Sequence, residues 1–129
     1  VILGILAAFA LPRFADLGGD ARASTLAGAQ GSVKSAAAIA PSAWLATDQA
    51  TPVDLDGTNI TMTDEGYPTA DVAGIGTAAQ LSTEDYVLTD GSATTVATIS
   101  PVGASTAATC IFSYNPQTGQ TSGFNDVGC

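Results

Sequence analysis

The chain begins with an uncharged and strongly apolar run over residues 1–11, which ends at Pro12. A helix that crosses a bilayer needs about 20 apolar residues, roughly twice this length. The run has no initiator methionine and no basic flank of the kind that precedes a signal sequence. Two interpretations follow, a short buried helix or the last part of a longer hydrophobic helix. The missing methionine favours the second.

Beyond Pro12, apolar residues recur every three or four positions, which is the period of a helix with one buried face. This pattern predicts one helix from near residue 1 to about residue 46. Pro12, the Gly18-Gly19 pair and Pro41 weaken it, and we expect Pro41 to bend or end it. The residues predicted to face a sheet are Leu26, Ala29, Val33, Ala36 or Ala37, Ala40 and Trp44.

The remainder of the chain alternates short β-prone runs with turns. Asp56-Gly57 between two such runs predicts a type I′ hairpin of strands 53–55 and 58–62. A short helix is predicted over residues 71–81, capped by Thr69 or Asp71. The later strands are predicted at 86–88, 94–100, 107–114 and 120–124. Together these elements predict an α+β protein in which a long N-terminal helix packs on an antiparallel β-sheet.

Composition adds that this is one domain with a modest core. The 129 residues are 46% hydrophobic but only 6% aromatic, and the net charge is −9. All three cations lie in the first 34 residues, whereas residues 35–129 carry ten acids and no cation. We therefore expect no direct binding of nucleic acid and no attraction to an anionic membrane face. The absence of histidine removes the common triads and the commonest general base.

Residues 1–25 hold more apolar side chains than one small domain can bury, so we expect other molecules to bury them. Arg22 and Lys34 have no acid three or four residues away. Their partners are therefore tertiary, intermolecular or water.

Cys110 and Cys129 are the two cysteines of the chain. A metal site would need more ligands, and a redox pair usually has the Cys-x-x-Cys spacing. We therefore predict a disulfide from an oxidising compartment. Closing this loop would stabilise the fold by about 3 kcal/mol.

Acidic residues in the loops raise the question of calcium. The Asp54-Leu-Asp56-Gly57 stretch fails the EF-hand register, because Pro52 would take the first position and Thr63 the last. Two further groups of acids could gather a cation, but solvated surface carboxylates are the preferred interpretation: Asp64, Glu65 and Asp71, and Glu84, Asp85 and Asp90. No nucleophile–base pair and no cofactor loop stands out, so the sequence predicts neither an enzyme nor a cofactor.

Several motifs carry a resemblance to a known family. The stretch 1–14, with Gly4 and Pro12 in an apolar helix, resembles the second half of the N-terminal segment of bacterial type IV pilins. The Cys110–Cys129 pair resembles the disulfide-bounded region of that family. Residues 21–26, residues 66–70 and Tyr114, four positions after Cys110, are similar to the mannose-sensitive haemagglutinin class of these pilins.

The resemblance implies the type IV pilin fold in two parts. Residues 1–25 would form a protruding hydrophobic half-helix, the filament core, and residues 26–129 a globular part that we call the head. Within the head the helix would run to about 46, followed by an αβ loop over 47–85, a sheet over 86–124 and a disulfide loop over 110–129.

The function implied is assembly, with no catalysis. Identical subunits would leave the inner membrane, and the pilus assembly machinery would polymerise them into an extracellular, cell-surface filament for adhesion or twitching motility. The N-methylated first residue of such pilins and the glutamate that follows it match no residue here. A major pseudopilin of a type II secretion system is the alternative, against which the C-terminal disulfide argues.

The resemblance and the pattern of charges also assign residues. Gly4 and Pro12 bound the stretch that is often unwound in assembled pili of this family. The residues expected in the filament core are Ile2, Leu3, Ile5, Leu6, Phe9, Leu11 and Phe14. The residues expected to make charge contacts between subunits are Arg13, Asp16, Asp20, Arg22 and Lys34.

Overall fold

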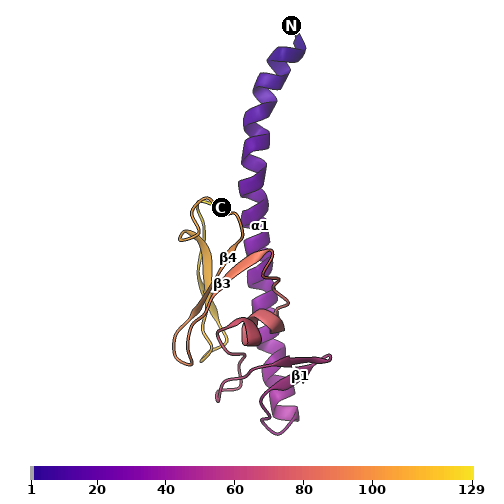
Figure 1. Ribbon diagram of the computed structural model, residues 1–129, viewed down its shortest axis with the longest axis vertical. Helices are drawn as coiled ribbons and strands as arrows, with labels where there is room; N and C mark the ends of the chain where they lie inside the picture. The colour runs from indigo at the N-terminus through magenta and orange to yellow at the C-terminus, as the bar shows by residue number, and fades with distance from the viewer. Residues whose placement is uncertain (1) are drawn as a thin grey trace.

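The computed structural model describes the backbone of residues 2–129 and the side chains from residue 18 onward. A single helix, α1 (Ile2–Ala46), packs along a four-stranded antiparallel sheet, and a two-stranded hairpin lies near its C-terminal end (Figure 1). The predicted α+β architecture, a long N-terminal helix on an antiparallel sheet, is therefore confirmed.

The helix is continuous over 45 residues. The backbone stays helical through Pro12, the Gly18-Gly19 pair and Pro41. We expected Pro41 to bend or end the helix, and the helix does not end there. At Pro41, packing of the helix on the hairpin through Ala40, Ala43 and Trp44 outweighs the local cost of proline. In the part of the chain that the structure describes, no helix combines the length and the apolar character needed to cross a membrane.

The main sheet has the order β3-β4-β5-β6, and every neighbouring pair is antiparallel. Its strands are β3 (Tyr86–Thr89), β4 (Ala97–Pro101), β5 (Cys110–Tyr114) and β6 (Thr121–Asp126). The register pairs Ile99 with Phe112 at the centre, and an irregularity between Ile111 and Ser113 shifts the pairing of β5 with β6.

Two of these strands begin three residues later than predicted. The hydroxyl of Ser92 accepts hydrogen bonds from the backbone N–H groups of Thr94 and Thr95, which form a turn before β4. Before β5, the N–H groups of Thr109 and Cys110 both donate to the carbonyl of Thr106. Threonine favours strands, but in both stretches a nearby hydroxyl or carbonyl oxygen accepts the hydrogen bonds of the backbone N–H groups. These stretches therefore form turns and not the first residues of a strand.

The small sheet pairs β1 (Val53–Leu55) with β2 (Thr58–Ile60). Asp56 and Gly57 have φ angles of 54° and 82°, so the type I′ turn that the Asp-Gly pair predicts is present. The N–H of Gly57 also donates to the Asp54 carboxylate at 2.6 Å. The second strand is shorter than predicted, because Thr61 donates to the carbonyl of Ala73 instead of continuing the hairpin.

The helix predicted over residues 71–81 is largely a π-helical turn, η1 (Val72–Gly76), followed by two helical residues. Asp71 caps it as predicted, and its carboxylate accepts from the N–H of Gly74 at 2.7 Å and from the hydroxyl of Thr69 at 2.8 Å. A side chain at Gly74 would lie 2.1 Å from the Thr69 hydroxyl oxygen. Glycine is therefore required where this turn folds back on Thr69.

Among residues 18–129, whose side chains are described, two hydrophobic clusters form the interior. The larger joins α1 to the main sheet around Leu26, Val33, Ile99, Phe112 and Tyr114, all fully buried. The smaller joins α1 to the hairpin; its buried members are Ala40, Val53, Ile60 and Met62.

The face of α1 predicted to be buried does face the two clusters. The positions from Leu26 to Ala40 in the predicted set are buried. Trp44 differs, since it is only partly buried and lies over Gly66, where a Cβ atom would come within 2.5 Å of the indole ring.

Candidate functional site

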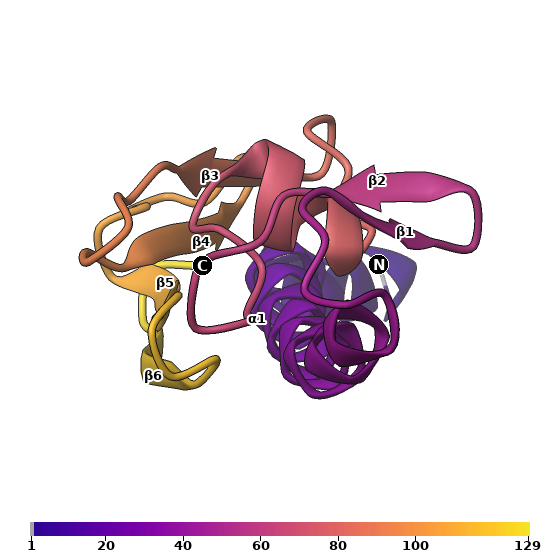
Figure 2. The same cartoon turned by 90° about the horizontal axis from the view of Figure 1, so that it is seen from below.

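The N-terminal part of α1 projects beyond the sheet, while the C-terminal part lies against it (Figure 1). Seen along the helix from its C-terminal end, the main sheet covers one side of α1, and the hairpin lies beside the end of the helix that is nearer the viewer (Figure 2). The residues predicted for the filament core and for unwinding all lie in the projecting part, as do Arg13 and Asp16. Their side chains are outside the described residues, and those predictions stay untested.

The head makes its first described contacts with the helix at Gly19 and Arg22. The Nε atom of Arg22 donates a hydrogen bond to the backbone carbonyl of Cys129. A Cβ atom at Gly19 would lie 3.7 Å from the carbonyl carbon of Cys129, so the segment that follows β6 passes directly over the helix. Of the three alternatives open for Arg22, the structure shows a tertiary partner.

The disulfide between Cys110 and Cys129 is present, as predicted, with the two Cα atoms 4.9 Å apart. It joins the first residue of β5 to the segment after β6, and both cysteines are buried. The carbonyl of Gly128 accepts from the N–H of Thr106 at 2.9 Å, which fixes the segment to the turn before β5. The disulfide, this turn and Arg22 together attach the C-terminal segment to α1.

The face of α1 opposite the sheet is lined by small and polar residues. Asp20 and Lys34 are both exposed on it. Between them, Gly28 and Gly31 are exposed as well, and a Cβ atom at either position would meet nothing within 4 Å. Near the end of the helix, Ile39 and Leu45 are 61% and 64% exposed. Gly28, Gly31 and Ile39 border a shallow groove whose other wall is the segment 78–80 that follows η1.

Two tyrosines that the sequence analysis did not assign connect the elements that position α1. The fully buried hydroxyl of Tyr114 donates to the carbonyl of Pro68 at 2.8 Å, joining β5 to the αβ loop. The hydroxyl of Tyr86 donates to the carbonyl of Thr25 at 3.2 Å, joining β3 to α1. Burial raises the pKa of both phenols. Tyr67 raises the pKa of Tyr114 further, and the charge of Asp85 raises that of Tyr86 further.

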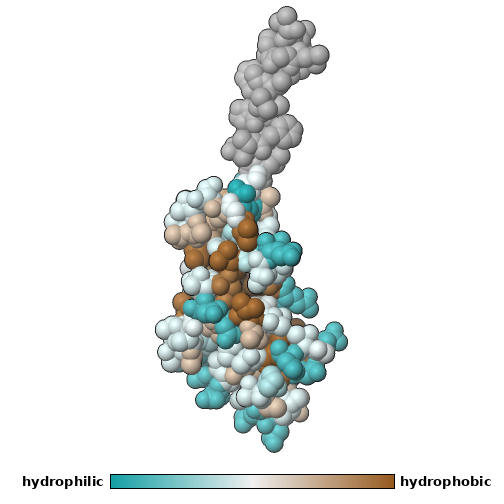
Figure 3. Space-filling model, in the orientation of Figure 1, coloured by the Kyte–Doolittle hydropathy of each residue, from teal (hydrophilic) through white to brown (hydrophobic). Residues whose placement is uncertain are grey.

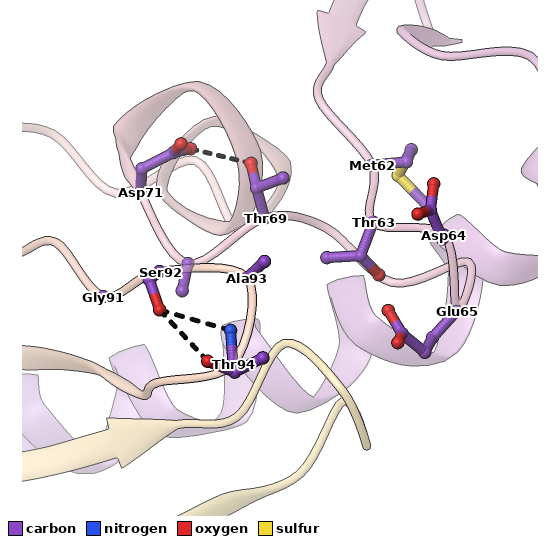
Figure 4. A pocket seen from close by; sticks show the side chains of 11 residues that line it. Met62, Thr63, Asp64, Glu65, Thr69, Asp71, Gly91, Ser92, Ala93 and Thr94 are labelled. Carbon is purple, nitrogen blue, oxygen red and sulfur yellow. Dashed lines mark hydrogen bonds between the residues drawn. The ribbon is translucent and has the colours of Figure 1, made fainter.

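The calcium hypothesis finds no support at the acidic residues of the αβ loop. Asp64 and Glu65 line one side of a pocket, whereas Asp71 lies on the other side, where its carboxylate accepts a hydrogen bond from the hydroxyl of Thr69 (Figure 4). Among the residues with described side chains, no three acidic, cysteine or histidine groups are close enough to hold a metal ion. The Asp71 carboxylate instead serves the cap of η1.

Apolar residues gather in a band along one face of the head, with hydrophilic residues on both sides of it (Figure 3). A separate groove runs beside Ile39, between α1, the hairpin and the segment after η1. Its walls include Leu55, Ile60 and Ala78, with Asp56 at the hairpin end.

Comparisons with protein-family models, with curated proteins and with solved structures find no match to the chain. The geometry therefore carries the functional argument. What the arrangement offers is a helix whose N-terminal part projects beyond a small, disulfide-closed head. The apolar composition of that stretch suits non-covalent association.

Proposed function

We propose that this chain is a structural subunit of the type IV pilin family, which polymerises through its N-terminal helix into an extracellular filament. The observation that carries the proposal is the continuity of α1: one 45-residue helix belongs both to the core of the head and to the part that projects beyond it. A rigid connection of this kind fixes the orientation of each head once its helix is bound in a bundle of like helices.

The composition of the projecting part supports association strong enough to hold a polymer. Burial of a large apolar side chain is worth about 1.5–3 kcal/mol as an upper range. The seven large apolar residues between Ile2 and Phe14 would then supply on the order of 10 kcal/mol or more. Part of this offsets the entropy of association. Head-to-tail contacts that do not close into a ring produce an open helical filament.

The charge distribution supports the same arrangement. Residues 35–129 hold ten acids and no cation, so a surface made of heads would be anionic and well solvated. The pilus assembly machinery and an inner-membrane stage before assembly belong to the proposal through the resemblance to type IV pilins. So do the cell-surface location and a role in adhesion or twitching motility.

Electron microscopy of filaments made from the full-length subunit tests the proposal. Leu6→Asp and Phe9→Asp should abolish filaments, because each places a charge in the helix bundle, while the head stays folded. Leu45→Asp is the matched control; this leucine is exposed at the other end of the same helix, and the variant should assemble normally. Normal filaments from Leu6→Asp or Phe9→Asp would contradict the core assignment. A short periplasmic fibre would instead identify a pseudopilin.

A further inference from the structure

We infer that Lys34 of one subunit binds the groove beside Ile39 on a second copy of this chain, where its ammonium group pairs with the carboxylate of Asp56. The contact joins the heads of neighbouring subunits. The inference rests on the proposed filament and names one of its subunit contacts.

The groove combines apolar walls with a single carboxylate. Its walls include the apolar side chains of Ile39, Leu55 and Ile60. Asp56, at the hairpin end, is the one charged residue among the described residues that line it. Lysine has an alkyl stem that packs on apolar surface and a terminal cation that pairs with an acid or stays in water. The groove therefore offers a suitable neighbour to each part of a lysine side chain.

The hairpin does not need the charge of Asp56. Its turn is stabilised by Asp54, whose carboxylate accepts from the N–H of Gly57 at 2.6 Å. Asp56 is exposed in the same turn, and its φ of 54° is a backbone angle that asparagine adopts equally well. The carboxylate of Asp56 can thus serve a partner without cost to the turn.

Lys34 is the cation that the head presents outward. It is exposed, and no acid stands three or four residues from it on the helix. The other cation with a described side chain, Arg22, donates to the carbonyl of Cys129. Residues 35–129 hold ten acids and no cation. Lys34 therefore gives one head a complementary charge for another head that is otherwise anionic.

Lys34 and the groove face nearly opposite ways, as a contact between parallel copies requires. The hairpin and β6 lie on opposite sides of α1 (Figure 2). Lys34 follows Gln30 by about one helical turn, and Gln30 donates to Thr121 at the start of β6, so Lys34 lies on the side of α1 nearer to β6. Ile39, which borders the groove, lies about 140° around the helix from Lys34 and only about 7.5 Å further along it. A neighbour beside the hairpin can therefore bring its Lys34 to the groove. Because the two surfaces differ, the contact repeats from copy to copy along a filament.

Carbodiimide coupling in assembled filaments tests the contact. A carbodiimide condenses an amine and a neighbouring carboxylate into an amide, and Lys34 is the only lysine of the chain. Unmodified filaments should give a ladder of covalent oligomers, in which mass spectrometry should identify an amide between Lys34 and Asp56. Lys34→Arg is the matched control, because arginine keeps the charge without a reactive amine; filaments should form and the ladder should be absent. An amide between Lys34 and any other acid would overturn the inference.

Removal of the acid gives a second, independent measurement. Asp56→Asn removes the charge and keeps a residue that favours the turn. It should abolish the ladder and raise the critical concentration for assembly about twofold to fivefold, the range expected for an exposed ion pair. Asp48→Asn is the matched control, because Asp48 is also an exposed acid with a positive φ, of 57°, and this variant should leave both unchanged.

The outcomes separate this contact from the filament itself. Unmodified filaments that form normally but give no ladder, or Asp56→Asn filaments that keep it, would overturn the contact and leave the proposed filament standing. Unmodified subunits that form no filament of any kind would overturn both.

Discussion

Arg22, on α1, donates a hydrogen bond from its Nε atom to the backbone carbonyl of Cys129, 107 residues away along the chain. The carbonyl belongs to a residue that is itself held by the disulfide to the start of β5. One side chain therefore connects the helix, the C-terminal segment and the sheet at the level where α1 leaves the head.

Replacing Arg22 by methionine should lower the free energy of unfolding by about 1–2 kcal/mol, because a partly buried carbonyl loses a charged donor. Methionine keeps much of the apolar stem, so the change removes the hydrogen bond and little packing. Urea denaturation of the detergent-solubilised chain measures the effect. Lys34→Met is the control and should change stability by less than about 0.5 kcal/mol, since Lys34 is exposed. Equal effects of the two variants would contradict the structural role of Arg22.

Loss of the disulfide should lower the free energy of unfolding more than loss of the Arg22 hydrogen bond. The bond closes a loop between cysteines 19 residues apart, and loop-closure entropy assigns about 3 kcal/mol to a loop of this size. The Cys110→Ser, Cys129→Ser double variant should therefore unfold at a clearly lower urea concentration, and reductant should move the original chain but not the variant. Hydrogen exchange should show the largest loss of protection in β6, an edge strand that the bond helps to hold on β5.

Tyr114→Phe should destabilise the fold by about 1–2 kcal/mol, because the buried carbonyl of Pro68 loses its donor. The variant should also change the response to alkali. Burial raises the pKa of Tyr114 above its ordinary value of 10.0, so the folded state keeps the proton after the unfolded state has lost it. The contribution of this phenol to the free energy of unfolding is therefore fully present below pH 10. Above pH 10 it falls, with a slope of up to about 1.4 kcal/mol per pH unit. Unfolding measured between pH 9 and 11 should show a shallower fall for Tyr114→Phe. An unchanged fall would contradict the assignment.

Gly28→Ala should raise the stability of the isolated subunit by about 0.5–1 kcal/mol, because alanine is the better helix former and the added methyl group meets open space. Gly66→Ala is the matched opposite case. Gly66 has a φ of 86°, and its Cβ would lie 2.5 Å from the ring of Trp44, so this variant should lose stability. Thermal unfolding of the two variants beside the unmodified chain compares them. A loss of stability in Gly28→Ala would show that the space around this glycine is already filled within the subunit.

Elements governed by local physics could be predicted from the sequence. The period of apolar residues located the helix and its buried face, and the Asp56-Gly57 pair identified the hairpin turn because both residues tolerate positive φ. The disulfide followed from the number of cysteines. Strand starts were less predictable, because the hydroxyl of Ser92 and the carbonyl of Thr106 capture N–H groups that threonine-rich stretches would otherwise give to a sheet.

Contacts between distant segments left no signal in a single sequence. The sequence indicates that Arg22 lacks a nearby acid, but only the packing of the C-terminal segment over Gly19 shows which carbonyl it reaches. From the sequence, Tyr114 is likewise predicted only to be an aromatic residue of a strand. The structure shows that the αβ loop places the carbonyl of Pro68 within reach of its hydroxyl. The exposed face of α1 could be located by period, yet the open space around Gly28 became visible only once the neighbouring elements were in place.

The position of the disulfide has a mechanical consequence. Tension applied through the projecting part of α1 would reach the head first at Gly19 and Arg22, where the C-terminal segment crosses the helix. Peeling of the edge strand β6 would begin at that crossing, and there the Cys110–Cys129 bond replaces a row of weak contacts by a covalent one. Force on the subunit is thus met by the strongest bond at the point where separation would otherwise start.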